Sequence, residues 1–208
     1  MTDGLATEAI TSEQASLSRR GEARVWDIAK ELADKGKIYV IMSAPSEAPA
    51  GLTAGNYRSP DDRHRMYGLA SYWMARQGES TYFAQYAKWQ PLRTFWMKAQ
   101  EHDIGQPRGD YYEWKENSTA GDSAGQKFRV YRRDYEKAIL LFRTRYDWDE
   151  KNFKTFDGRT EKFDLGGEYR MLYPDGSLGP AISRIGLCLA EGVVLVPAGG
   201  IAPQPESR

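Results

Sequence analysis

Apolar and polar positions along the first half of the chain change their spacing in a way that predicts alternating strands and helices. Residues 3–9 are mostly small or apolar and end near Glu8, and residues 37–43 form an almost continuous apolar run. Short apolar runs of this kind are typical of strands, and a continuous one is typical of a parallel strand covered on both faces. Residues 80–85 indicate a third strand.

Helix signals occupy the two segments between these strands. Thr11 and Gln14 fit a capping box at the start of a helix, and Gly36 follows its last apolar positions. Ser59 followed by Pro60 is typical of the first turn of a second helix. The order strand, helix, strand, helix, strand predicts parallel neighbouring strands joined by helical crossovers.

The second half of the chain predicts antiparallel strands. A short helix is expected at residues 92–101, and residues 115–126 form a polar linker. The expected strands are residues 130–131, 138–143, 169–173, 182–189 and 193–197. Turn signals occur at Asp157-Gly158, Gly166-Gly167 and Asp175-Gly176. The pattern predicts a small antiparallel β appendage that follows the α/β part.

Charge and composition exclude several classes of partner. The chain of 208 residues has 29 Lys and Arg against 29 Asp and Glu, so no excess positive charge is available to neutralise a nucleic acid. No apolar run approaches the roughly 20 residues that span a bilayer, and the first residues lack a signal-peptide pattern. We therefore expect a soluble chain without nucleic acid or a membrane span. The single Cys188 excludes an internal disulfide and leaves the cellular compartment open.

Candidate catalytic residues come from the carboxyl ends of the predicted parallel strands, where chemistry gathers in α/β folds. Glu8 closes the first strand behind two small residues, where partial desolvation would suit an acid, base or nucleophile. Glu47 follows the second strand, and Asp110 lies in a Gly-containing loop. Each also has a plain structural explanation, as a helix-capping or solvated carboxylate.

Candidate substrate-binding residues are mainly aromatic, because sugar rings present apolar C–H groups that stack on aromatic faces. They are Tyr82, Gln85, Tyr86, Trp89, Tyr112, Glu113 and Trp114. Core packing is the competing explanation for any one aromatic side chain. His64 and His102 lack the spacing of a metal pair, and no nucleotide-binding or nucleophile-elbow motif occurs, so we expect neither a metal nor a cofactor.

Three stretches resemble glycoside hydrolases with a TIM-barrel catalytic domain, notably the hypothetical glycosyl hydrolase family fifteen. They are DGLATEA from residue 3, ASYWMARQGESTYFAQY from residue 70, and RVYRRDYEKAILLFR from residue 129 with LGGEYRMLYPDG from residue 165. The resemblance implies a catalytic carboxylate at Glu8 and a chain that is the C-terminal part of such a protein. Its expected fold is a partial (β/α)8 barrel followed by an antiparallel β appendage.

This resemblance implies a division of the chain and a function. Residues 1–127 would be the C-terminal part of the barrel, residues 128–197 its last strand region with the β appendage, and residues 198–208 a flexible tail. The expected function is hydrolysis of glycosidic bonds in a poly- or oligosaccharide by two carboxylates. The alternatives are a non-catalytic carbohydrate-binding module and an inactive truncated barrel, which would pair with a missing N-terminal half or another chain.

Overall fold

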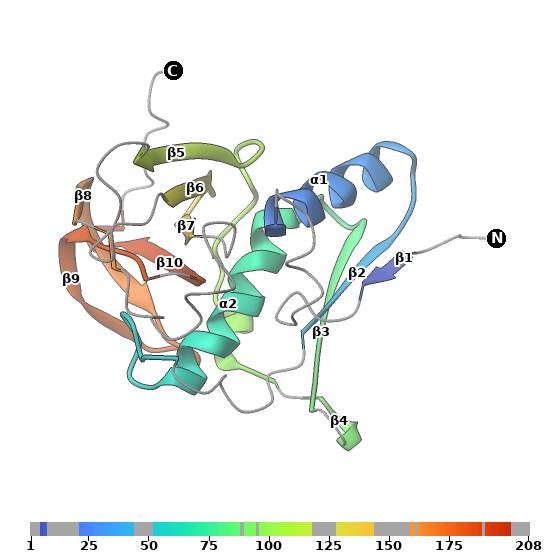
Figure 1. Ribbon diagram of the computed structural model, residues 1–208, viewed down its shortest axis with the longest axis horizontal. Coiled ribbons are helices and arrows are strands. Elements are labelled where there is room, and N and C mark those ends of the chain that lie inside the picture. Colours follow the sequence, from blue (N-terminus) through green and yellow to red (C-terminus); the bar gives the residue numbers. More distant parts are fainter. Residues whose placement is uncertain are drawn as a thin grey trace.

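A computed structural model gives the structure of the chain. It describes residues 5–7, 21–43, 52–87, 90–94, 96–117, 128–143, 159–160, 162–188 and 190–200. Two sheets lie on either side of a central helix, and a second helix lies beside the smaller sheet (Figure 1).

The smaller sheet has four strands in chain order. They are β1 (Leu5–Thr7), β2 (Tyr39–Ser43), β3 (Thr81–Ala87) and β4 (Gln90–Thr94). β1, β2 and β3 are parallel, with Tyr39 of β2 opposite both Leu5 and Thr81. The predicted parallel order of the first three strands is thus confirmed. β4 runs antiparallel to β3, because the two residues between them are too few for a crossover.

The larger sheet has six antiparallel strands. They are β5 (Tyr112–Asn117), β6 (Phe128–Asp134), β7 (Ile139–Arg143), β8 (Phe163–Leu172), β9 (Leu178–Ile185) and β10 (Glu191–Pro197). Their order is β5-β6-β7-β10-β8-β9, so the last strand among the described residues lies at the centre, between β7 and β8. β5 lies before the division expected at residue 128, yet it belongs to the same sheet as the strands that follow this division.

The expected partial (β/α)8 barrel is wrong. Most described elements are strands, only two α-helices occur among the described residues, and the six-stranded sheet is antiparallel and open. A TIM barrel requires each parallel strand to be followed by a helix. That alternation ends at β3, where the chain turns directly into antiparallel β4.

Two local predictions in the second half also differ from the structure. The helix expected at residues 92–101 is β4 followed by the short 3-10 helix η2 (Lys98–Glu101). Gly166-Gly167 does not end a strand, since both residues lie inside β8 at an irregularity in its pairing with β9, where Gly166 has a φ of 71°. The turn at Asp175-Gly176 is confirmed, with Gly176 at a φ of 79° between β8 and β9.

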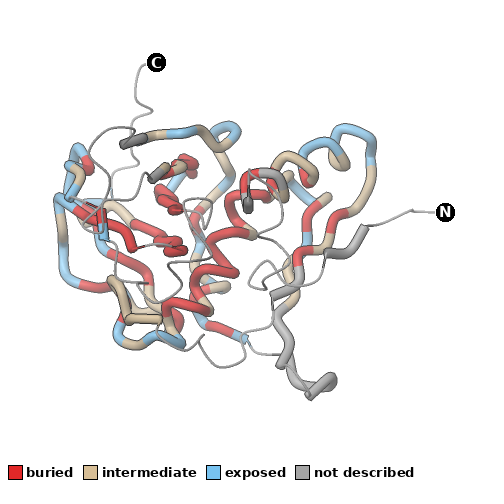
Figure 2. The backbone as a smooth tube through the Cα atoms, viewed as in Figure 1, coloured by how far each residue is buried: buried red, intermediate tan, exposed pale blue. Residues whose placement is uncertain are grey.

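The two helices differ in their surroundings. α1 (Gly21–Asp34) lies against α2 and β2, whereas α2 (Pro60–Ala75) packs on both sheets and is largely buried (Figure 2). Ser59 caps α2, as its side chain accepts a hydrogen bond from the Asp62 amide, and Pro60 occupies the first turn. In the part of the chain that the structure describes, no helix is long and apolar enough to cross a membrane.

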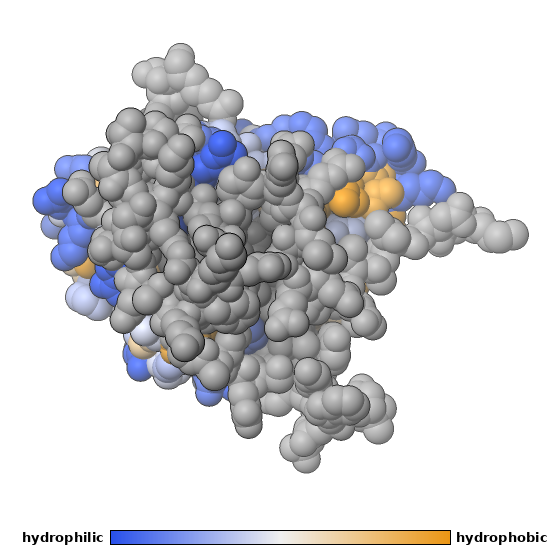
Figure 3. Space-filling model, in the orientation of Figure 1, coloured by the Kyte–Doolittle hydropathy of each residue, from blue (hydrophilic) through white to orange (hydrophobic). Residues whose placement is uncertain are grey.

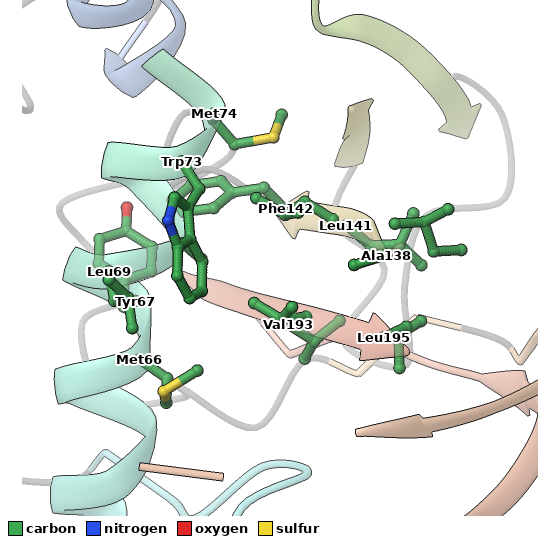
Figure 4. Packing of buried hydrophobic residues seen from close by; sticks show 14 of the residues in the cluster. Met66, Tyr67, Leu69, Trp73, Met74, Ala138, Leu141, Phe142, Val193 and Leu195 are labelled. Atoms are coloured by element: carbon green, nitrogen blue, oxygen red, sulfur yellow. The ribbon is translucent and has the colours of Figure 1, made fainter. Parts of the chain in front are cut away.

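The main core lies between α2 and the centre of the larger sheet. Met66 and Trp73 on α2 face Phe142 of β7 and Val193 of β10 (Figure 4). Trp73 is therefore a core residue, as its position on the apolar stripe of the helix predicts. β7 and the first part of β10 are buried throughout, which explains the continuous apolar runs at residues 139–142 and 193–195.

A buried carboxylate fixes the segment that leads into α2. Glu191, at the start of β10, is 0% exposed and accepts hydrogen bonds from the Asn56 amide at 2.7 Å and the Cys188 amide at 2.7 Å. The Asn56 side-chain Nδ2 donates to it as well, at 3.0 Å. Because a buried charge is tolerated only with such partners, these bonds hold the chain before α2 against the larger sheet.

Close approach of α2 to β10 requires glycine at position 192. A Cβ placed there would lie 2.6 Å from Cβ of Ala70 and 2.8 Å from Cδ2 of Phe142. Both neighbours belong to the buried core, so neither can move without shifting the helix or the strand.

We predict that Gly192→Ala destabilises the protein by about 1–3 kcal/mol, because the added methyl overpacks the contact between helix and sheet. Gly199→Ala is the control, since a Cβ at Gly199 meets nothing within 4 Å. Urea unfolding of both variants measures the difference. Equal midpoints would show that α2 and β10 are not closely packed.

Candidate functional site

A polar cavity of about 320 Å³ opens where α2 ends. Its lining residues come from the end of α2, the segment that follows β4 and the turn between β6 and β7. They are Trp73, Arg76, Gln100, His102, Asp103, Ile104, Gly105, Gln106, Glu136 and Lys137. Most of these side chains can donate or accept hydrogen bonds, which suits a small polar ligand.

The end of α2 at the cavity is fixed by residues of β6 and the residue after it. Arg133 Nη1 donates to the carbonyl oxygens of Trp73 at 3.1 Å and Met74 at 2.7 Å. The Tyr135 hydroxyl also donates to the Trp73 carbonyl, at 2.7 Å. Burial lowers the pKa of Arg133 and raises the pKa of Tyr135 to about 12, so both remain protonated donors at neutral pH. The last carbonyls of the helix are thereby satisfied.

Backbone hydrogen bonds join the two loops that form the rest of the cavity. The Glu136 amide donates to the Gln106 carbonyl at 3.0 Å, and the Lys137 amide donates to the Ile104 carbonyl at 3.1 Å. In return, the Gln106 amide donates to Glu136 Oε2 at 3.0 Å. The loops are therefore held together by their own main chains, and the cavity does not depend on a ligand to form.

Gly105 allows this close approach of the two loops. Its φ is 75°, which side chains rarely adopt, and a Cβ at this position would lie 2.6 Å from Cβ of Glu136. The Gly105 amide also donates to Asp103 Oδ1 at 3.0 Å.

The two carboxylates of the cavity are both engaged. Asp103 forms an ion pair and a hydrogen bond with Lys137. The hydrogen bonds from the Lys137 ammonium and the Gly105 amide lower the pKa of Asp103, and the Asp103 partner raises the pKa of Lys137. Asp103 is consequently a poor general acid, because it is ionised over the whole neutral range.

Three other cavity side chains have no such partner. Arg76, Gln100 and His102 form no side-chain hydrogen bond or ion pair with the described residues. Trp73 and Ile104 are buried, at 4% and 3% exposure, and close the apolar side of the cavity. The arrangement can bind a polar molecule through the three uncommitted groups.

An exposed aromatic lies just before η2, whose last residues lead into the cavity. Trp96 is 66% exposed, and its indole Nε1 donates to Glu101 Oε1 at 2.6 Å. The hydrogen bond limits rotation of the ring, so the indole presents a fixed apolar face to solvent.

Of the three predicted catalytic residues, the structure describes only Asp110, which does not line this cavity. Asp110 forms an exposed ion pair with Lys30 of α1, and it lies away from the cavity lining. Glu8 and Glu47 lie outside the described residues. Among the described residues, no group of three or more His, Cys, Asp or Glu side chains is placed to hold a metal ion.

The predicted substrate-binding residues are divided between the two sheets. Tyr82 of β3 is 52% exposed, whereas Trp114 of β5 is partly buried against Phe163 and lies 5.6 Å from the Arg132 guanidinium. The Tyr112 hydroxyl is 3.2 Å from Asp134 Oδ2, and Glu113 Oε2 is 3.7 Å from Arg129 Nε. These contacts make β5 part of a packed sheet edge.

The remaining candidates have no described side chain. Gln85 and Tyr86 are placed only by their backbone at the end of β3, and Trp89 lies outside the described residues.

The sequence pattern did not identify the cavity residues, because they come from three separate segments of the chain. A signal for one of them was the sequence Asp103-Ile104-Gly105, which is typical of a tight polar loop.

We predict that Gly105→Ala destabilises the protein by about 1–3 kcal/mol, because alanine is strained at this φ and its Cβ collides with Glu136. Gly109→Ala, in the same segment, is the matched control, since nothing lies within 4 Å of a Cβ there. Thermal unfolding measures both. A Gly105→Ala variant as stable as Gly109→Ala would contradict the loop geometry.

No protein-family model matches the chain, and no curated protein matches its sequence significantly. The expected membership of a glycoside hydrolase family such as the hypothetical glycosyl hydrolase family fifteen is therefore wrong. No family model supports it, and the fold is not a TIM barrel.

Proposed function

We propose that this protein binds carbohydrate, with the polar cavity as the binding site. The observation that carries the proposal is the set of uncommitted polar groups in a preformed cavity of about 320 Å³. Sugar hydroxyls both donate and accept hydrogen bonds, so an amide, an imidazole and a guanidinium at one place complement them. Gln100, His102 and Arg76 supply these three groups.

Trp96 supports binding of more than one sugar unit. η2 has four residues, so Trp96 and the cavity residues Gln100 and His102 lie on the same short segment. A saccharide seated in the cavity can extend toward the indole, whose apolar face suits stacking by a sugar ring. On the face in Figure 3 most of the described surface is hydrophilic, and the most prominent apolar area lies near α1.

Hydrolysis of a glycosidic bond stays a prediction of the sequence. Its main residue, Glu8, follows directly after the carboxyl end of β1, which is parallel to β2 and β3. The binding proposal does not need this activity. An assay for released reducing sugar, with Glu8→Gln beside the unchanged protein, separates a hydrolase from a binding protein.

We expect the double variant Gln100→Ala/His102→Ala to weaken binding of oligosaccharides at least tenfold, because it removes two hydrogen-bonding groups that have no role in the described fold. Glu168→Ala, on the exposed part of β8, is the control. Calorimetric titration with a panel of neutral and acidic oligosaccharides gives the affinities. Binding that survives the double variant would remove the cavity as the site.

We expect Trp96→Ala to weaken binding of oligosaccharides several-fold and to leave binding of the matching monosaccharide unchanged. The reason is that the indole contacts only sugar units beyond the one in the cavity. The affinities of Trp96→Ala for both ligands are measured by calorimetric titration, and binding of the monosaccharide serves as the control. Equal losses for both ligands would show that Trp96 does not form a separate contact.

A further inference from the structure

Arg76 is the charged group in the cavity whose position is least explained by the fold. It follows directly after the last residue of α2, where the negative end of the helix would ordinarily attract it. The carbonyls of Trp73 and Met74 are already taken by Arg133 and Tyr135. The half-buried Arg76 guanidinium therefore lines the cavity without an ion pair or hydrogen bond to any described residue.

Neither carboxylate of the cavity forms an ion pair or a hydrogen bond with the Arg76 guanidinium. Asp103 is paired with Lys137, and Glu136 Oε2 accepts the Gln106 amide. A carboxylate bound in the cavity would supply the partner that the Arg76 guanidinium lacks among the described residues.

We propose that the cavity takes an acidic saccharide of the uronic acid type, with its carboxylate bound by Arg76. This inference rests on the proposed carbohydrate binding and names the substrate class of the same site. The planar guanidinium fork binds a carboxylate through two parallel hydrogen bonds. The sugar hydroxyls then face Gln100 and His102, which line the same cavity.

The test compares a galacturonic acid oligosaccharide with a neutral galactose oligosaccharide of the same length by calorimetric titration. Acetate and inorganic sulfate are titrated as probes of charge alone. We expect the unchanged protein to bind the acidic ligand at least tenfold more tightly than the neutral one. Arg76→Gln lowers the affinity for the acidic ligand more than the affinity for the neutral one, and so removes this preference. Arg170→Gln is the control: it makes the same charge change at an exposed residue of β8, and we expect it to retain the preference.

The outcomes separate this inference from the proposed function. Equal affinity for both oligosaccharides, or a preference that survives Arg76→Gln in a protein with unchanged circular dichroism, overturns the acidic class and leaves carbohydrate binding intact. Failure of both oligosaccharides to bind overturns both proposals. Sulfate or acetate binding as tightly as the acidic oligosaccharide overturns the saccharide ligand and shows a simple anion site.

Discussion

Packing of α2 against β10 is the constraint on which the rest of the structure depends. The helix lies close enough to the strand that position 192 must be glycine. Tyr57 strengthens the same contact, since its hydroxyl donates to the Gly192 carbonyl at 2.5 Å. The amide of the preceding residue, Asn56, donates to the Glu191 carboxylate. Because α2 also packs on β3, this one contact joins the two sheets.

The polar cavity is a consequence of how α2 ends. Arg133 reaches from β6 to the helix carbonyls, and its Nε donates to the Gly109 carbonyl at 3.0 Å. One side chain thus fixes the helix end and the loop after the cavity together. With these carbonyls occupied, Arg76 is left available at the cavity wall, so a structural hydrogen bond network creates the chemical character of the site.

The sequence did not identify the residues of the candidate site. Aromatic residues suggested a sugar ligand, yet among the described residues the exposed indole is that of Trp96, while the predicted Trp114 packs against Phe163. Asp110 was chosen for its polar loop, and the structure pairs it with Lys30, 80 residues earlier. Sequence spacing does not report such distant pairs, because they arise only when α1 is placed beside β5 and its preceding loop.

Local pattern determined the elements whose signals lie within a few residues: the Ser59 cap with Pro60, the apolar runs of β2 and β7, and the glycine turn at Gly176. These depend on backbone geometry and burial, which short segments encode directly. Only the tertiary structure decided that β10 lies at the centre of an antiparallel sheet and that Arg76, Gln100 and Glu136 share a cavity. Strand order and site assembly depend on packing between segments far apart in the chain, and many arrangements satisfy the same local pattern.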